Sequence, residues 1–322
     1  MLQKLNKQLE RIMPLITPVG VLTGVIFSVH LRDFSYLIPW IFAFMTFAGS
    51  LGSNFRSLKE VIVRPFPILI AMFILHILMP IWAWSVGHVV FPGDIYTITG
   101  LVLGMAIPTG VTSFMWVAIY KGNIPLVLSI ILIDTLLSPI IVPYSLSLFL
   151  GEKIEMDFIN IMKGLLEMVV IPSLVGMYLN QATKGKIKDQ LGTRLAPFSK
   201  LSLGIVVMLN GAVVAPYLKN INLKLVSITL VVFLIALTGY LFSFLIGKLV
   251  KGGRDNIISL TFAGGMRNIS AGAVIAVSFF PAAVAVPVVV GMLFQQVLAS
   301  LNGHFLNKYY DKKVEMKDSV AL

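Results

Sequence analysis

Long apolar stretches alternate with short polar segments along the whole chain. About 20 apolar residues in a helix cross the hydrocarbon core of a membrane, so each stretch predicts one membrane-spanning helix. We predict ten spans, at 12–30, 36–53, 65–90, 95–120, 125–149, 158–180, 197–217, 224–248, 255–280 and 284–307. This pattern is typical of an all-α polytopic membrane protein.

Two of these stretches, 95–120 and 255–280, are interrupted near their middle. The interruptions fall at Pro108 and Gly110 in the first stretch and at Gly264 and Gly265 in the second. An offset of 156 residues superimposes the two stretches and places Thr112 on Asn268. Corresponding broken helices in two halves of a chain are the typical sign of a transporter's binding site. The alternative is two kinked but ordinary spans, since Gly and Pro are common in membrane helices.

The spans divide into two sets of five, in residues 1–150 and 156–310. Because five is odd, the second set enters the membrane from the opposite side, which predicts an inverted repeat. With the N-terminus inside, most of the 25 Lys and Arg residues fall in cytoplasmic segments. This bias predicts that both termini are cytoplasmic, in a bacterial-type inner (plasma) membrane.

Composition excludes several other classes of protein. The 322 residues are 57% hydrophobic and 12% charged, whereas a soluble domain carries about 25% charged residues. The net charge of +11 is explained by membrane topology and anionic lipid, so no nucleic-acid partner is expected. The four His residues form no metal-ligand pattern and no nucleophile–base spacing is present, so we expect neither an enzyme nor a cofactor.

A few polar residues lie inside the apolar stretches and are candidates for function. They are His76, Asp134, Asn210, Arg267 and Gln295. A charge at membrane depth is a functional hypothesis by default, so Arg267 and Asp134 come first. Asp134 has no partner nearby in the sequence and requires one from another span, or else it is protonated. Histidine titrates near neutral pH, so His76 is either a packing residue or a candidate for proton coupling.

Three sequence motifs resemble the bile acid:sodium symporter (BASS) family. They are Gly-Met-Arg-Asn at 265–268 with the Gly/Ala-rich run and Pro that follow, Pro-Thr-Gly at 108–110, and Leu-Leu-Ser-Pro at 136–139. The resemblance covers nearly the whole chain. It implies a panel domain of spans one, two, six and seven and a core domain of spans three to five and eight to ten, with the broken helices crossing at mid-membrane. Transporters of this family carry bile acids, pantoate, pyruvate and other organic anions, usually with sodium.

The resemblance also locates the family's sodium ligands, most of which are replaced here. The corresponding positions are Leu75, Ser113, Phe114, Val127, Ile131, Ala263 and Arg267. Sodium needs several converging oxygens, but most of these side chains are apolar and one is a cation. We therefore predict that both sodium sites are lost. Arg267 would stand where a cation sits in the family, with Asp134 as its counter-charge.

In the alternative arrangement Arg267 binds the carboxylate of the substrate directly. Thr112, Ser113, Asn268, Asn210 and Gln295 would then complete the site. The predicted function is a sodium-independent secondary transporter of small organic anions that works by alternating access. Its rivals are a sodium-coupled symporter with backbone ligands and a membrane sensor on the same scaffold. Substrate, coupling ion, transport direction and oligomeric state stay open at this point.

Overall fold

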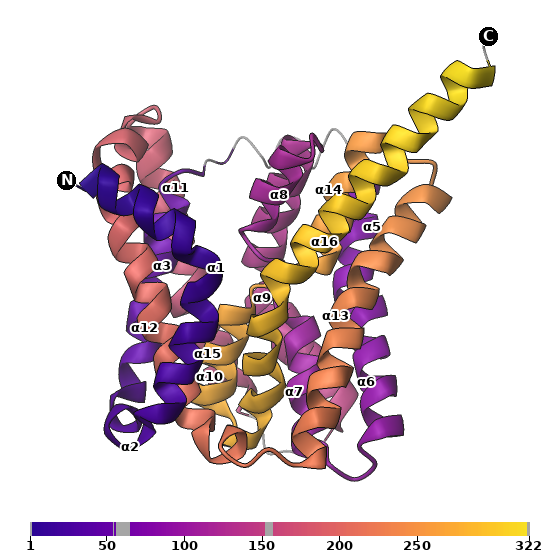
Figure 1. Cartoon of the computed structure of the whole chain (residues 1–322). Coiled ribbons are helices and arrows are strands. Elements are labelled where there is room, and N and C mark those ends of the chain that lie inside the picture. Colours follow the sequence, from indigo (N-terminus) through magenta and orange to yellow (C-terminus); the bar gives the residue numbers. More distant parts are fainter. Residues whose placement is uncertain (1, 54, 56–64, 152–156, 321–322) are drawn as a thin grey trace.

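The described chain is helical throughout in a computed structural model (Figure 1), which covers residues 2–53, 55, 65–151 and 157–320. Within these ranges no strand is present, and one isolated β-bridge is the only extended pairing. The prediction of an all-α protein is therefore confirmed.

The helices of the first half run from the N-terminus to residue 150. Their bounds are α1 (Leu2–Ile26), α2 (Ser28–Leu31), η1 (Arg32–Leu37), α3 (Ile38–Ser50), α5 (Pro65–Phe73), η2 (Ile74–Leu78), α6 (Met79–Val90), α7 (Ile95–Ala106), α8 (Ser113–Ile119) and α9 (Ile124–Leu150). The element η2 is a π-helical turn that joins α5 and α6 into one continuous helix.

The second half follows the same general order. Its elements are α10 (Phe158–Leu165), η4 (Leu166–Val170), α11 (Ile171–Ala182), η5 (Lys188–Gly192), α12 (Thr193–Leu218), α13 (Leu223–Leu249), α14 (Arg254–Gly265), α15 (Ile269–Phe279) and α16 (Ala282–Val320). Both halves thus contain one helix that is interrupted between two shorter pieces, α7 and α8 in the first and α14 and α15 in the second.

Six helices in the described residues are long and apolar enough to cross a membrane. They run over Pro65–Val90, Ile124–Leu150, Phe158–Ala182, Lys188–Leu218, Leu223–Leu249 and Ala282–Tyr310. The predicted spans 12–30 and 36–53 instead correspond to a pair of helical segments, Leu15–Ile26 and Ser28–Ser50, bent by 90°. Taken together, the pair raises the number of candidate spans to seven. The count of ten spans and the inverted repeat stay predictions.

Short polar residues start several of these helices. Their side chains accept a hydrogen bond from a backbone N–H in the first turn, which would otherwise lack a partner. Asp94 caps α7, Asn123 caps α9, Asp157 caps α10, Asn222 caps α13 and Asn268 caps α15. The polar segments between apolar stretches therefore determine where each helix begins.

The helices form two groups with a third between them (Figure 1). On one side α1 packs along α12, and α3 packs on α11 and α12. On the other side α13 packs on α14, and α6 follows α5 through η2. The helices α7, α9 and α15 lie between these groups in the view of Figure 1.

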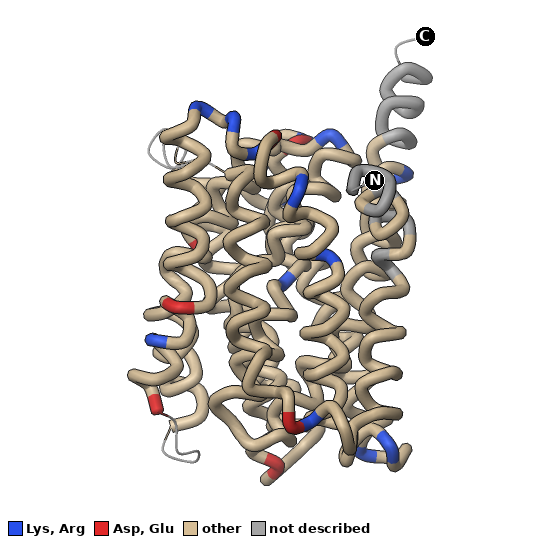
Figure 2. Tube along the Cα trace, turned by 90° about the vertical axis from the view of Figure 1, so that its left-hand side faces the viewer, with Lys and Arg blue, Asp and Glu red and all other residues tan. Residues whose placement is uncertain are grey.

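Charged residues lie mainly toward the two ends of the molecule (Figure 2). Large apolar side chains are instead exposed along the helices, among them Trp40, Leu148 and Leu230. An exposed apolar perimeter between two charged ends is what a bilayer requires. The chain is a multi-pass membrane protein.

Candidate functional site: the crossing of the two broken helices

The two breaks meet and pair with each other. Residues 107–112 separate α7 from α8, and residues 266–268 separate α14 from α15. Thr109 and Arg267 form an antiparallel β-bridge. The N–H of Gly110 donates to the carbonyl of Met266 at 3.0 Å, and the N–H of Asn268 donates to the carbonyl of Pro108 at 2.8 Å. Each break thus satisfies backbone groups of the other in a region from which water is excluded.

The first break contains both residues predicted to cause it, Pro108 and Gly110. A Cβ atom at Gly110 would lie 2.9 Å from the carbonyl oxygen of Arg267. Because that neighbour is backbone held in the bridge, it has little room to move. Gly110 therefore permits the close approach of the two extended segments.

The second break begins later than the sequence suggests. Gly264 and Gly265 are the last residues of α14 rather than part of the extended segment. A Cβ atom at Gly264 would lie 2.0 Å from Oγ of Ser243, and one at Gly265 would lie 2.3 Å from the ring of Tyr240. These glycines serve the tight packing of α14 on α13, so their assignment as the break itself was wrong.

Thr109 joins the two breaks to the neighbouring helix α9. Its hydroxyl lies 2.6 Å from the carbonyl of Ala263 and 3.0 Å from that of Met266. Its backbone N–H donates to Oδ2 of Asp134 at 2.6 Å. From the sequence, Thr109 was predicted only as part of a break motif, although a hydroxyl between Pro and Gly in a membrane helix marks a group that needs a partner.

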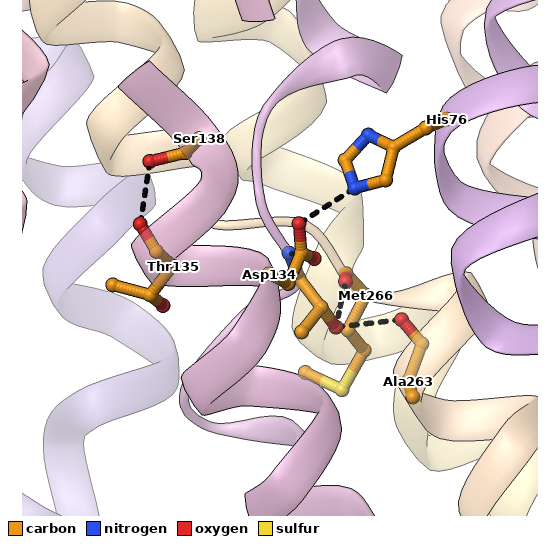
Figure 3. A network of polar contacts seen from close by, with 7 residues as sticks. His76, Asp134, Thr135, Ser138, Ala263 and Met266 are labelled. Atoms are coloured by element: carbon orange, nitrogen blue, oxygen red, sulfur yellow. Dashed lines mark hydrogen bonds and ion pairs between the residues drawn. The ribbon is translucent and has the colours of Figure 1, made fainter. Parts of the chain in front are cut away.

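Asp134 is fully buried and takes a partner from another span, as one of the two predicted alternatives required. That partner is His76 of η2, whose Nε2 lies 2.7 Å from Oδ1 (Figure 3). The predicted direct contact between Asp134 and Arg267 is not formed. One carboxylate oxygen faces His76 and the other faces the N–H of Thr109, so both are already engaged.

Arg267 is 2% exposed, and none of its three guanidinium nitrogens has a hydrogen-bond partner within the described chain. Asp134 and Tyr240 lie within electrostatic range without touching it. A buried cation costs several kcal/mol unless it is paired and hydrogen-bonded. The guanidinium of Arg267 is thus a buried cation whose donors are unused within the described chain.

A cavity of about 610 Å³ adjoins the crossing. Its wall at the breaks includes Gly110, Thr112, Arg267 and Asn268. The opposite wall comes from α1, α3, α11 and α12, with Thr17, Thr46, Ser173 and Leu203. Lys188 and Lys200 extend the lining toward the end of the molecule where the N-terminus lies. The cavity therefore separates the α1–α3–α11–α12 group from the broken helices.

The predicted substrate-binding residues divide into two sets. Thr112, Arg267, Asn268 and Gln295 line the cavity. Ser113 and Asn210 do not line it, and both are fully buried with side-chain polar atoms that find no partner in the described chain. Their role in substrate binding stays a prediction.

Five of the seven positions that correspond to the family's sodium ligands hold apolar packing side chains, while Ser113 keeps a buried hydroxyl that has no partner in the described chain. Leu75, Val127 and Ala263 are fully buried in one apolar cluster. Phe114 and Ile131 instead line the cavity. These five side chains offer no oxygen to a cation.

Comparison with known proteins bears on this arrangement. The model of the "Sodium Bile acid symporter family" matches residues 39–221, more than half of the chain. This chain belongs to the sodium bile acid symporter family. The matched residues include the first break and end before the second. The family resemblance inferred from the motifs is thus confirmed, and the protein is a transporter-family member rather than an enzyme.

Individual relatives agree with this placement in the symporter family. The Bacillus subtilis "Uncharacterized protein YbaS" is 54% identical over 95% of this chain and all of its own length. The "Uncharacterized sodium-dependent transporter YocS" of the same organism is 26% identical over 92% of this chain and 91% of its own. An Arabidopsis thaliana "Probable sodium/metabolite cotransporter BASS1, chloroplastic" is 24% identical over 74% of this chain and 58% of its own.

Proposed function

We propose that this protein is a sodium-independent secondary transporter of small organic anions that works by alternating access. The observation that carries the proposal is Arg267, a buried guanidinium without a hydrogen-bond partner in the described residues, at the wall of the cavity. The planar fork of a guanidinium binds a carboxylate through two parallel hydrogen bonds. A carboxylate at this position would satisfy both the charge and the donors.

The other groups at the cavity wall suit the same ligand. Asn268 lies at the N-cap of α15, where the positive end of the helix dipole favours an anion. Thr112 and Gln295 add neutral polar groups. Phe42, Met45 and Phe114 supply apolar surface, which suits a carboxylate with a hydrophobic body. The class includes the bile acids, pantoate and pyruvate that the family resemblance implied.

Two features support sodium independence: the side chains at the family's ligand positions and the backbone near the crossing. The five apolar side chains at the family's ligand positions offer no oxygen, so an ion would depend on main-chain carbonyls. Near the crossing those of Pro108, Ala263 and Met266 already accept hydrogen bonds. A fixed guanidinium in the same region also repels a cation. This argues against the rival hypothesis of a sodium-coupled symporter with backbone ligands.

The transport cycle would move the two groups of helices that face each other across the cavity. The helices α1, α3, α11 and α12 correspond to the panel domain, and those that carry the breaks correspond to the core domain. Ten spans in two inverted repeats, a bacterial plasma-membrane location and cytoplasmic termini complete the proposal. Relative motion of the groups would expose the crossing to one side of the membrane and then to the other.

Uptake into proteoliposomes tests this function. The purified protein is reconstituted and offered radiolabelled taurocholate, pantoate or pyruvate in sodium, potassium or choline medium of equal ionic strength. We expect uptake of at least one anion above that of protein-free liposomes, at equal rates in the three media. Uptake that requires sodium would contradict sodium independence. Absence of uptake for all three anions would favour the rival hypothesis of a sensor.

A further inference from the structure

His76 and Asp134 contact each other and do not line the cavity. Nε2 of the ring lies 2.7 Å from Oδ1 of a carboxylate that is wholly buried. The side chain of His76 is 7% exposed. Its Nδ1 is buried and makes no hydrogen bond to any described residue. This nitrogen is therefore the position at which an additional proton can enter.

His76 sits in η2, the π-helical turn that interrupts an otherwise regular helix. A π-helical turn shifts the following residues around the helix axis, and such turns are frequent at functional sites. Here the turn places the ring opposite Asp134, on a helix 58 residues away in sequence. A π-helical turn also precedes Pro172 in the second half, as η2 precedes Pro80, so the turn accompanies the proline and sets the position of the ring.

The sum of the charges buried at the crossing explains why a proton on His76 would matter for transport. Asp134 and Arg267 carry opposite charges, so their sum is zero while His76 is neutral. A bound monocarboxylate makes the sum negative, in surroundings where an uncompensated charge is costly. A proton on His76 restores neutrality. The three ionisable side chains and the substrate can therefore cross the membrane without net charge.

We propose that His76 and Asp134 form a proton-binding site, and that one proton accompanies each organic anion through the transporter. This inference rests on the proposed function and names the coupling ion for it. For a monocarboxylate the coupled step is electroneutral. The proton takes the place of the coupling cation for which the chain has lost its oxygen ligands.

Few other titratable side chains among the described residues lie near His76, Asp134 and Arg267. Beyond Asp134 and Arg267, Tyr240 of α13 is the titratable side chain within range of the crossing. The helix α5 has no titratable residue. Other titratable residues on the packed elements lie near helix ends or are exposed outside the bundle: His88, Tyr96, Tyr144, Lys163, Glu167, Arg254 and Asp255.

The pair is also connected to the moving parts. Oδ2 of Asp134 accepts a hydrogen bond from the N–H of Thr109. Thr109 in turn forms the β-bridge with Arg267. A change in the charge of the pair therefore acts on the backbone that positions the guanidinium. Thr135, the next residue in α9, lines the cavity. The proton site is thus one residue away from the space that the substrate occupies.

A pH gradient across proteoliposomes tests the inference in the wild-type protein. A gradient of about 2 units, acid on the side of the labelled anion, is imposed without sodium. Each unit is a factor of ten in proton activity, so accumulation of taurocholate, pantoate or pyruvate can rise to about 100-fold. A potassium diffusion potential should leave accumulation unchanged. Protein-free liposomes correct for passive entry of the protonated acid.

Separate outcomes distinguish the two proposals. Uptake that proceeds equally with and without the pH gradient would overturn the proton site and leave the anion transporter standing. Uptake that responds to the potential would overturn the electroneutral charge balance. If none of the three anions is taken up under any gradient, both proposals fail.

Variants assign the effect to the pair. His76→Arg keeps the positive charge of the protonated ring permanently, so it should lose gradient-driven accumulation but keep exchange of labelled for unlabelled anion at equal pH, because exchange needs no net movement of protons. His88→Gln, a histidine in the last turn of α6, should keep both activities. Gradient-driven accumulation in His76→Arg, or loss of exchange together with accumulation, would overturn the assignment.

Discussion

The two broken helices solve the same backbone problem with different side chains. In both, an extended segment of a few residues separates two helices, and the segments pair as a single β-bridge. The first break uses neutral groups, with Thr109 held by Asp134 and by two carbonyls of the second. The second break carries Arg267, whose guanidinium has no hydrogen-bond partner in the described chain.

This difference suggests separate roles for the two breaks: the first stabilises the crossing, and the second carries the group proposed to bind a ligand. The first break is fully engaged and fixes the geometry of the crossing. The second break carries a buried cation without a hydrogen-bond partner in the described chain, and under the proposed function a bound anion would pair with it. A site of this kind gains affinity because its donors are already desolvated and in position.

Loss of the positive charge of Arg267 should have the largest effect on transport. Arg267→Gln removes the guanidinium, and a buried charged hydrogen-bonded pair contributes about 2–5 kcal/mol when one partner is deleted. We expect proteoliposome uptake of the transported anion to fall on the order of 100-fold or more. Arg194→Gln alters an exposed arginine at the start of α12 and should transport normally. Unchanged uptake in Arg267→Gln would exclude a role for this residue.

Loss of the carboxylate that supports the first break should have the next largest effect, and it should lower the stability of the protein. Asp134→Asn removes the charge that faces His76 and offsets Arg267, and it weakens the acceptor for Thr109. Leaving the N–H of Thr109 and the ring of His76 without their charged acceptor costs about 1–3 kcal/mol. Thermal melting in detergent should show a clear decrease. Ser138→Ala, which removes only a hydroxyl bonded to its own helix, should melt near the wild type.

Glycine packing gives a smaller contrast between the two helices that precede the breaks. A Cβ atom at Gly264 of α14 would lie 2.0 Å from Oγ of Ser243, whereas one at Gly104 of α7 meets nothing within 4 Å. Overpacking costs about 1–3 kcal/mol. Gly264→Ala should therefore melt lower than the wild type, and Gly104→Ala should not. Equal melting of the two variants would contradict the tight contact of α13 and α14.

Helix capping gives the smallest effect. Asn268 accepts a hydrogen bond from the N–H of Ala271 at 3.3 Å, but Thr112, at the corresponding position before α8, makes no capping bond with its side chain. Replacement of a capping side chain by Ala costs about 1 kcal/mol. Asn268→Ala should therefore melt lower than Thr112→Ala. The reverse order would show that the two breaks are not stabilised as described.

Much of the architecture could be predicted from the order of residues along the chain. The interval 65–90 was predicted as one span and is one continuous helix, and the break in 255–280 was predicted within a few residues. Apolar runs and helix-breaking residues are local properties, so they can be recognised in the sequence. The prediction for the first 53 residues was less accurate, because the bend between α1 and α3 depends on packing.

The candidate site was predicted in part. The importance of Arg267 and Asp134 followed from charge within an apolar stretch, and Thr112, Asn268 and Gln295 do line the cavity. The partner of Asp134 was predicted wrongly. Ser113 and Asn210 were predicted at the site because of their chemistry, and they do not line this cavity.

The sequence by itself determined that the chain spans a membrane, that two helices break, and which unusual charges are buried. These depend on composition and local propensity. The tertiary structure alone decided that the breaks pair with each other, that Asp134 contacts His76, and that Arg267 is left without a hydrogen-bond partner in the described chain. Each of these requires helices distant in sequence to meet at a given rotation about their axes, and such rotation is set by packing across the whole bundle.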